Sequence, residues 1–322
     1  MNQTSKRYGD LCRRRQNFLQ RAWDASELTI PFTLPRHGTQ DQELPTPYQS
    51  IGARGVNNLS AKLLLTLFPP NSPFFKFQID DFTLAELEAQ RAPVEEGLNA
   101  MERSVMDEVE AKAMRVPLNE ALRHLIITGN ACLHVDKDNA VRVFHLDQFV
   151  VRRDPQGKML EIIVHELMSR ELYMDIFGTL PPKESGDSDK ADEKELNLYT
   201  VVRRKDNKIH VHQEVNDMKI PNTDSKYPLD KNPWLTLRFS SIDGEDYGRG
   251  FVEEYLGDLK ALEGLSKAIL EGSCAAARAI FLVRPNGTTK LKTISQAPNL
   301  AVRQGSAEDV SVLQMEKFND FR

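Results

Sequence analysis

Two clusters of carboxylates in this sequence have the composition of a magnesium site. Asp243, Glu245 and Asp246 stand within four residues of each other, and Asp80 is followed directly by Asp81. Paired carboxylates hold Mg²⁺ in metal-dependent nucleases, so these acids raise the possibility of DNA cleavage. Acids just before a helix also interact favourably with its N-terminal dipole. We favour that structural role for the Asp243 cluster and keep the nuclease as the alternative.

Other candidate chemistry is weaker. His210 and His212 point to the same face of a predicted strand, as zinc ligands do, but no His-x-x-Glu or Cys-x-x-Cys pattern lies nearby to complete a site. Residues 52–55 (GARG) lack the Gly-Lys-Ser/Thr ending of a phosphate-binding loop. The small residues there favour close helix packing instead. The sequence therefore predicts no catalytic, cofactor-binding or metal-binding residue, and no enzyme.

The three cysteines, Cys12, Cys132 and Cys274, are far apart in the sequence. An odd number without Cys-x-x-Cys spacing argues against a disulfide framework. We expect unreactive thiols in apolar surroundings and a reducing compartment.

Composition narrows the class of protein. The chain has 322 residues, 40% apolar and 28% charged, with a formal net charge of −5. This length predicts about two domains, and the negative charge argues against a protein that grips nucleic acid along its whole surface. Apolar runs stay shorter than a membrane span requires, and the first residues lack the apolar core of a secretory signal. No membrane association is predicted.

Helical patterns dominate the first part of the chain. Residues 5–26 form a basic amphipathic pattern with Leu11, Leu19 and Ala22 on one face. The arginines around that face, Arg13–Arg15 and Arg21, indicate a solvated surface or, alternatively, a contact with DNA or another anionic partner. Further helices are predicted over residues 48–68, 94–109 and 117–129, with a capping box at residues 83–86.

The pattern then changes to short strands. They are predicted at residues 132–135, 141–144, 149–151, 160–165 and 234–239, with a hairpin formed by 196–202 and 209–215. Residues 154–157 have the composition of a tight turn between two of them. Residues 181–195 contain almost nothing to bury and predict a mobile loop. Helices followed by mostly antiparallel strands indicate an α+β fold.

The longest pattern begins after the Gly-rich residues 243–250. No proline interrupts residues 251–279, which predict one long helix. Its apolar stripe comprises Leu256, Leu259, Leu262, Leu265 and Ile269. The other faces carry charges, so the helix is too polar to cross a membrane. A narrow stripe on a long helix is typical of packing beside other long helices, and we expect these residues to join subunits.

Four segments resemble one known family. They are residues 48–63 (YQSIGARGVNNLSAKL), 125–135 (LIITGNACLHV), 243–250 (DGEDYGRG) and 254–259 (EYLGDL). They occur in the family's order along the whole chain. The sequence resembles the portal proteins, the head-to-tail connectors of short-tailed bacteriophages.

The resemblance implies a portal-type fold with distinct regions. Residues 1–250 would form a wing of helices and antiparallel strands, 251–279 the first stem helix, and 280–314 a small α/β clip with strands near 281–283 and 299–302. Residues 315–322 would begin the returning second stem helix. Family members continue with that helix, a tunnel loop, a further wing helix and a C-terminal crown. By that comparison the chain is expected to be truncated, without the crown.

The implied function is mechanical. Portal subunits form a ring, usually a dodecamer, at one capsid vertex of the virion, and double-stranded DNA passes through it during packaging and genome ejection. The implied partners are the major capsid protein, the terminase large subunit, the tail adaptor protein and internal core or scaffolding proteins, with assembly in the host cytoplasm and no cofactor. A capsid scaffold or tail adaptor without a DNA channel is the alternative.

The expected clip carries a basic group of residues. Arg284, Lys290, Lys292 and Arg303 lie in a segment without acids. They form either a docking patch for a partner or ordinary surface charge, and the sequence favours neither interpretation.

Overall fold

A computed structural model describes residues 3–36, 43–70, 72–79, 91–181, 195–277, 280–283 and 310–313. The chain divides into two compact units, Met1–Leu259 and Lys260–Arg322. Several predicted features lie outside the described residues: Asp80 and Asp81, the capping box at 83–86, nearly all of the 181–195 loop, the strand near 299–302, and residues 315–322.

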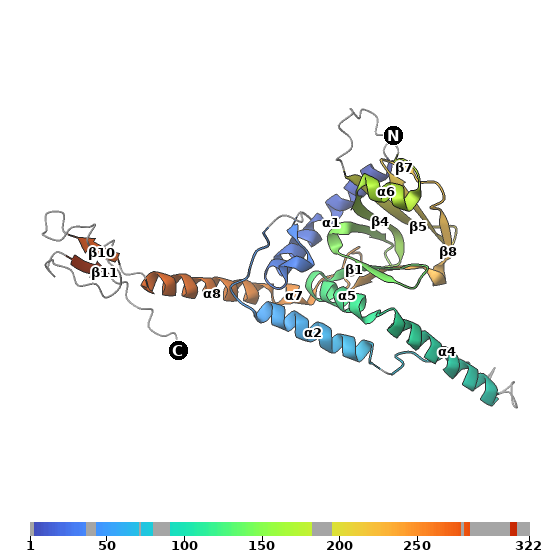
Figure 1. The fold of residues 1–322 in the computed structure, drawn as a ribbon, viewed down its shortest axis with the longest axis horizontal. Coiled ribbons are helices and arrows are strands. Elements are labelled where there is room, and N and C mark those ends of the chain that lie inside the picture. Colours follow the sequence, from blue (N-terminus) through green and yellow to red (C-terminus); the bar gives the residue numbers. More distant parts are fainter. Residues whose placement is uncertain are drawn as a thin grey trace. The chain divides into compact units, whose positions relative to one another are not determined.

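The helices predicted over residues 5–26, 48–68, 94–109 and 117–129 are confirmed. The helices of the first unit are α1 (Gln3–Glu27), α2 (Ile51–Leu67), α4 (Arg91–Ala111), α5 (Arg115–Thr128), α6 (Arg170–Phe177) and α7 (Phe251–Glu254), with single turns η1 (Pro31–Thr33), η4 (Leu146–Gln148) and η6 (Leu229–Lys231) (Figure 1). Gly129, with φ of 76°, ends α5 in the left-handed conformation that glycine adopts without strain. The Gly-Asn signal after residue 128 therefore marks the helix end.

The strands predicted between residues 132 and 239 are also confirmed, and they form two antiparallel sheets. The smaller sheet has the order β2-β1-β9, made of Val141–Phe144, Asn130–Val135 and Trp234–Arg238. The larger has the order β3-β4-β5-β6, with β7 and β8 both paired to β6. Its strands are β3 (Phe149–Arg153), β4 (Met159–Met168), β5 (Leu196–Lys205), β6 (Lys208–Val215), β7 (Met218–Lys219) and β8 (Ser225–Pro228).

Two turns fix the register of the larger sheet as predicted. Gly157, with φ of 79°, closes the β3–β4 turn by donating its N–H to the Asp154 carbonyl at 2.9 Å. Asp206 and Asn207 have φ of 50° and 57° between β5 and β6. Short polar side chains tolerate these angles. The strands β7 and β8 were not predicted, because segments this short, next to prolines, show no clear alternation of apolar and polar residues.

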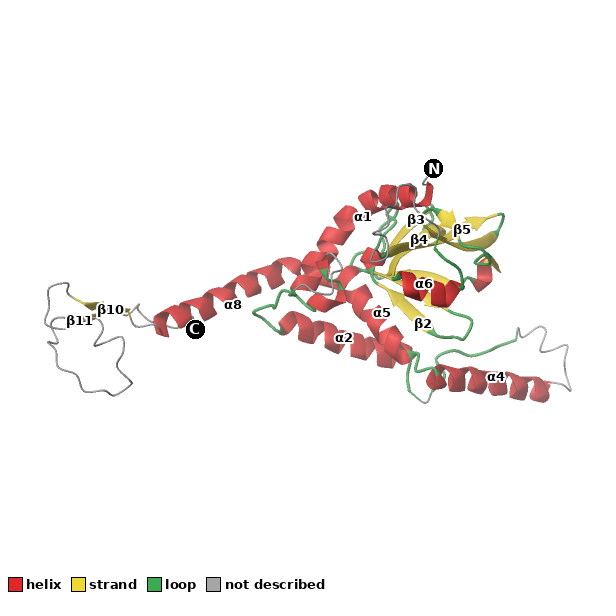
Figure 2. Ribbon diagram, turned by 45° about the horizontal axis from the view of Figure 1, so that its top comes forward, coloured by secondary structure: helices red, strands yellow, loops and turns green. Residues whose placement is uncertain are grey.

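The core lies where the two sheets and α1 meet (Figure 2). Its buried aromatic residues include Trp23, Phe144, Phe149 and Tyr247. A second cluster joins α1, α2, α5 and α7 through Ala25, Ile30, Val56, Ile126, Ile127 and Val252. Burial of each large apolar side chain stabilises the fold by about 1.5–3 kcal/mol. These helices packed on antiparallel sheets confirm the α+β class.

One arginine of α1 contradicts the expectation of a solvated basic face. Arg14 is exposed, as expected, but Arg15 is only 4% exposed. Its guanidinium donates to the carbonyl oxygens of Leu146, Asp147 and Phe149 at 2.7–2.9 Å. A buried arginine needs this many acceptors to replace water. Arg15 therefore ties α1 to the η4–β3 turn.

The α4 helix leaves part of its apolar stripe exposed. Met101 and Val105 are 60% and 41% exposed, whereas Glu102 is buried. The carboxylate of Glu102 accepts the Phe77 N–H at 2.7 Å. Among the described side chains of this helix, the buried ones are therefore Glu102, which the apolar pattern did not select, and Val109, which it did.

Helix α8 (Leu256–Ala277) begins in the first unit and continues in the second. The second unit also contains β10 (Ile280–Val283), which pairs antiparallel with β11 (Val310–Leu313). The strand at 281–283 is thereby confirmed, while its partner β11 was not predicted. Among the described helices, none combines the length and apolar character of a membrane span.

Candidate functional site: the anchor of the long helix

The long helix is divided at Tyr255. Residues 251–279 were predicted as one helix, but α7 ends at Glu254 and α8 begins at Leu256. Tyr255, with φ of −107° and ψ of 10°, donates its N–H to the Val252 carbonyl at 3.1 Å, three residues back instead of four. Its own carbonyl accepts the Leu259 N–H at 3.0 Å. The prediction of an unbroken helix is therefore wrong at this one residue.

A hairpin-like loop, residues 239–250, leads from β9 into α7. Ser240 and Arg249 pair across it through two backbone hydrogen bonds of 3.2 and 2.8 Å. Gly244, with φ of 78°, makes the reversal. The pairing carries residues 247–250 back to the end of α5.

Three glycines allow the loop and the α5–β1 junction to touch backbone to backbone. A Cβ added to Gly129 would lie 2.3 Å from the carbonyl carbon of Arg249. One added to Gly250 would lie 2.4 Å from the Ile127 oxygen, and one added to Gly248 would lie 2.7 Å from the Gly129 oxygen. Only glycine fits these contacts. The Gly-rich sequence thus serves close packing.

Asn130 locks this contact with its side chain. Its amide nitrogen donates to the Gly248 carbonyl at 2.9 Å, and its amide oxygen accepts the Gly248 N–H at 2.7 Å. The same nitrogen donates to the Thr128 carbonyl at 3.0 Å. Asn130 is buried, so these bonds replace the water that its amide would lose.

Tyr247 and Asp246 fasten the loop to the larger sheet. The buried Tyr247 hydroxyl accepts the Val151 N–H at 3.0 Å, and burial raises the pKa of this phenol, so it stays protonated. The Asp246 carboxylate accepts the Arg153 N–H at 2.6 Å. The Arg153 side chain donates to the Asp246 carbonyl at 3.0 Å, and burial lowers the pKa of Arg153 to about 10, which leaves it charged at neutral pH.

A chain of ion pairs surrounds the first turn of α7. Glu253 accepts from Arg21 of α1 at 3.1 Å and from Arg249 at 3.2 Å. Arg249 also pairs with Glu245 at 3.0 Å. Glu253 therefore complements the α7 N-terminal dipole, whereas Glu245 and Asp246 bind arginines. The helix-dipole role that we favoured for the Asp243 cluster is corrected accordingly.

Apolar contacts complete the anchor. Val252 is buried in the second core cluster, and Leu256 and Leu259 pack against the same cluster. Further along α8, Leu262 is half-buried, whereas Leu265 and Ile269 are 56% and 60% exposed. The predicted stripe is thus divided: its first two residues hold α8 to the body, and its last two lie on the surface.

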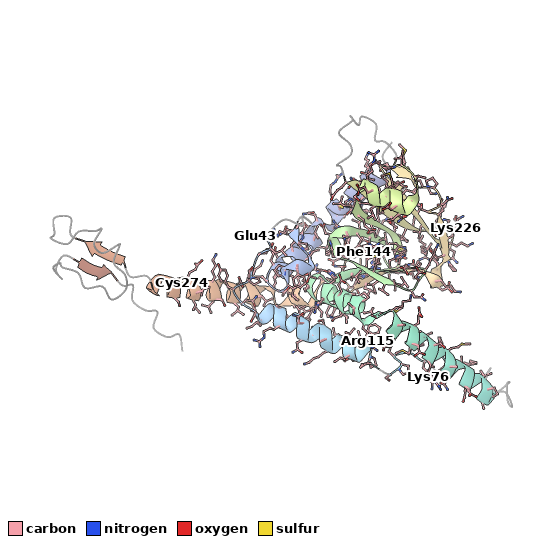
Figure 3. All side chains as sticks on the ribbon, in the orientation of Figure 1. Glu43, Lys76, Arg115, Phe144, Lys226 and Cys274 are labelled. Carbon is pink, nitrogen blue, oxygen red and sulfur yellow. The ribbon has the colours of Figure 1, made fainter. Side chains whose placement is uncertain are left out.

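The other sequence candidates that lie within the described residues do not form a chemical site. His212 pairs with Glu214 at 2.9 Å, and no group of three potential metal ligands occurs in the part of the chain that the structure describes. Cys12 and Cys132 are half-buried and buried as expected, but Cys274 is exposed on α8 (Figure 3), contrary to the expectation for all three thiols. The basic residues Arg284, Lys290, Lys292 and Arg303 lie outside the described residues.

Sequence reasoning placed Arg15 on a basic helix face and used Gly129 and Asn130 only as a helix end, so it missed the tertiary contacts that these residues make. Gly129 and Asn130 follow the apolar end of a helix, where Gly-Asn is a helix-stop signal. Nothing local could have shown that they meet residues 248–250, because that contact spans 118 positions.

The match to known proteins covers this whole arrangement. The family model described as bacteriophage head to tail connecting protein matches residues 1–321. The chain belongs to this family. The portal protein of Enterobacteria phage T3 is 36% identical over 98% of the chain and 60% of its own length. The portal protein of Escherichia phage T7 is 34% identical over 94% of the chain and 58% of its own length.

A third relative extends the match to a more distant phage. The portal protein of Enterobacteria phage SP6 is 26% identical over 96% of the chain. The chain spans about 60% of the length of the curated relatives it matches. The connector family therefore accounts for the segments 48–63, 125–135, 243–250 and 254–259 by which the resemblance was predicted.

Proposed function

We propose that this connector-family chain is part of a portal subunit, which assembles into a ring at one vertex of the phage capsid. In this proposal, residues 1–250 are the wing, 251–279 the first stem helix, 280–314 the clip, and 315–322 the start of the second stem helix. The role is mechanical, not enzymatic. The ring, usually a dodecamer in portal proteins, surrounds a channel for double-stranded DNA.

The observation that carries the proposal is the division of the long helix. One end is fixed by the buried Val252 and by Asn130, whereas Leu265 and Ile269 further along are largely exposed. A monomer gains nothing from apolar side chains held in water. A long helix with exposed apolar side chains is suited to pack against the same helix of the next subunit.

Charge supports passage of DNA through such a ring. The net charge of this chain is −5, so these 322 residues carry no overall excess of phosphate-binding groups. A channel through which DNA slides needs weak contacts, because each phosphate neutralised by lysine or arginine adds affinity.

The proposed partners follow from this position in the virion. The terminase large subunit and later the tail adaptor protein dock at the clip, where Arg284, Lys290, Lys292 and Arg303 form the candidate patch. The wing faces the major capsid protein and the internal core or scaffolding proteins. Assembly takes place in the host cytoplasm before the ring becomes part of the virion.

The test is the assembly state of the full-length protein. Light scattering should give one large discrete oligomer, and negative-stain images should show rings with a central channel. A stable monomer at micromolar concentration would overturn the proposal. Oligomers without a central channel would instead support a capsid scaffold or tail adaptor.

A further inference from the structure

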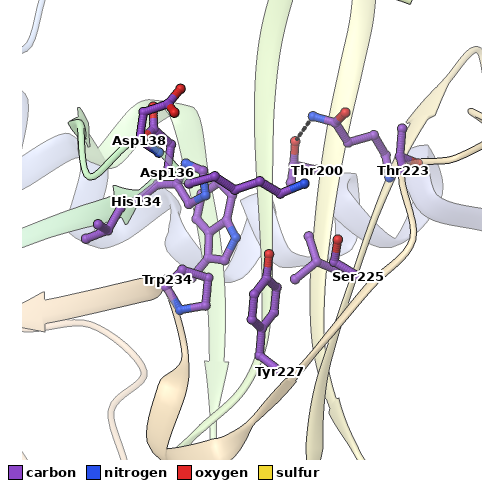
Figure 4. Close-up of a pocket in the computed structure, with 13 residues that line it drawn as sticks. His134, Asp136, Asp138, Thr200, Thr223, Ser225, Tyr227 and Trp234 are labelled. Carbon is purple, nitrogen blue, oxygen red and sulfur yellow. Dashed lines mark hydrogen bonds between the residues drawn. The ribbon is translucent and has the colours of Figure 1, made fainter.

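A pocket of about 490 Å³ opens between the two sheets (Figure 4), and none of its lining residues belongs to the anchor of the long helix. The smaller sheet contributes His134 at the end of β1 and Trp234 at the start of β9. The larger sheet contributes Thr200 from β5 and residues of β6 and β8. All lining residues belong to the first unit. The volume lies within the ordinary range for ligand pockets, roughly 300–1,000 Å³.

One side of the pocket is a flat aromatic wall. The rings of His134 and Trp234 stack with centroids 4.1 Å apart and an interplanar angle of 19°. Trp234 is also stacked near Phe144 of the core, so its position is fixed from behind. Figure 4 shows the Tyr227 hydroxyl directed into the space between this wall and Ser225. Because Trp234 is only 5% exposed and lies between Phe144 and His134, a planar group can lie against the half-buried His134 ring, with a hydroxyl at its edge.

The opposite side presents ordered oxygen acceptors. Gln213 donates its amide nitrogen to the Thr200 hydroxyl at 3.2 Å, and its backbone N–H to the Thr223 hydroxyl at 3.1 Å. The Thr223 hydroxyl in turn donates to the Ile220 carbonyl at 2.7 Å. These bonds hold the hydroxyl oxygens in place, and each oxygen retains acceptor capacity.

The mouth carries three charged residues in one tight loop. The Asp136 carboxylate accepts the N–H groups of Asp138 and Ala140 at 2.8 Å each, which fixes the loop. Asp136 and Asp138 outweigh Lys137, so the lining carries a net negative charge. Burial, assisted by the nearby Arg142, lowers the pKa of His134. The imidazole is therefore neutral at pH 7 and adds no positive charge.

We propose that this pocket binds an arginine side chain presented by a protein partner. A guanidinium group is planar, stacks on aromatic rings and offers five N–H donors to fixed acceptors. The carboxylates at the mouth attract its charge and repel phosphate. A lysine ammonium matches the charge but has no planar group to lie against the His134 ring.

Binding can be measured on the chain without any substitution, using fluorinated tryptophan as the spectroscopic label. The sequence has two tryptophans, Trp23 and Trp234, so 5-fluorotryptophan gives two ¹⁹F signals. A Trp23→Phe sample serves only to assign them. N-acetyl-arginine amide is the probe, and N-acetyl-citrulline amide is its uncharged control of nearly equal shape. The chemical shift of the Trp234 signal should change saturably with the arginine compound. The citrulline compound should bind at least about threefold more weakly or cause no change.

Charge variants separate this proposal from other ligands. Asp138→Asn removes a charge, and Asp136→Asn does so while keeping an oxygen that can accept the same two N–H groups. Each should weaken arginine binding about threefold, as expected for a partly exposed pair. Lys137→Gln should strengthen it. The proposal would be overturned if the aspartate variants bound the arginine compound more tightly and Lys137→Gln bound it more weakly. Tighter binding of adenosine or of inorganic phosphate than of the arginine compound would also overturn it. An unmoved Trp234 signal at tens of millimolar probe would also overturn it.

Discussion

Asn130 and Gly248 bind each other twice although 118 residues separate them. The Asn130 amide donates to the Gly248 carbonyl at 2.9 Å and accepts the Gly248 N–H at 2.7 Å. A side-chain amide here imitates a peptide group in an antiparallel pair. The loop before α7 is thereby bonded to the α5–β1 junction as a strand would be, and the start of α7 is held to the body of the first unit.

Removal of this amide should destabilise the body of the protein. Asn130→Ala leaves the Gly248 N–H and carbonyl buried without partners, and each such group costs about 1–3 kcal/mol. We expect a loss of about 3 kcal/mol, measured by urea unfolding. The matched control is Asn99→Ala on the exposed surface of α4, where the change should be within about 0.5 kcal/mol. Equal stability of the two variants would contradict the role of Asn130.

Two glycines near α7 should respond oppositely to alanine. Gly250→Ala places a Cβ 2.4 Å from the Ile127 oxygen, so the loop must move away, and we expect a loss of at least about 2 kcal/mol. Gly257 in α8 has no heavy atom within 4 Å of its would-be Cβ. Gly257→Ala should therefore stabilise the helix by about 0.5–1 kcal/mol. Thermal unfolding measures both, and a destabilised Gly257→Ala would show a contact that the structure lacks.

Arg15 and Arg14 are neighbours with opposite environments. Arg15→Leu removes the donors for three carbonyl oxygens, each bound at 2.7–2.9 Å, so we expect a loss of about 2–4 kcal/mol. Arg14→Leu should change stability by less than about 0.5 kcal/mol, because Arg14 is exposed. Denaturant unfolding of the pair measures the difference. Both substitutions remove one positive charge. Equal losses of stability would therefore mean that the hydrogen bonds of Arg15 contribute no net stability.

Acid should weaken one buried ion cluster. Glu161 is 5% exposed and accepts from Arg7 at 3.0 Å and from Arg203 at 3.2 Å. Burial alone would raise the pKa of Glu161, but the hydrogen bonds from the two arginines outweigh it and lower the pKa. A lowered pKa stabilises the fold at pH values above the unfolded value of about 4.3. That contribution is lost as pH falls through the folded-state pKa.

The pH dependence gives a direct measurement. Glu161→Gln should lower the free energy of unfolding by about 2 kcal/mol at pH 7. The difference in unfolding free energy between this variant and the wild type should shrink as the pH falls below about 4. Glu96→Gln, at an exposed position of α4, is the control and should show no such convergence. A constant difference between pH 3 and pH 7 would mean that shape, not charge, makes Glu161 important.

The sequence was sufficient for elements whose signals are local. Leu11, Leu19 and Ala22 predicted the buried face of α1, and residues 154–157 predicted the β3–β4 turn, because periodicity and turn propensity depend on near neighbours. The break at Tyr255 was not predictable. Tyr255 has no helix-breaking character, and the break depends on contacts of α7 with residues far away in sequence.

The anchor was predictable only in part. Residues 243–250 were selected correctly, but their acids were expected to complement a helix dipole. Asp246 instead accepts the Arg153 N–H at 2.6 Å, and Glu245 pairs with Arg249. A carboxylate near a helix start serves either purpose, and only the tertiary position of Arg153 decides between them.

The exposed part of α8 provides the decisive test of the portal proposal. Leu265 and Ile269 are 56% and 60% exposed, so Leu265→Gln with Ile269→Gln should leave the unfolding free energy of the body within about 0.5 kcal/mol. If neighbouring subunits bury these side chains, each substitution by glutamine removes about 1.5–3 kcal/mol of association free energy per contact. In the full-length protein, the double variant should therefore shift the light-scattering mass from rings to smaller species. Leu167→Gln removes an equally exposed leucine, 58%, from β4 and should leave the rings intact. Intact rings in the double variant would assign the subunit contact to another surface, and loss of rings in Leu167→Gln alone would place it on the larger sheet.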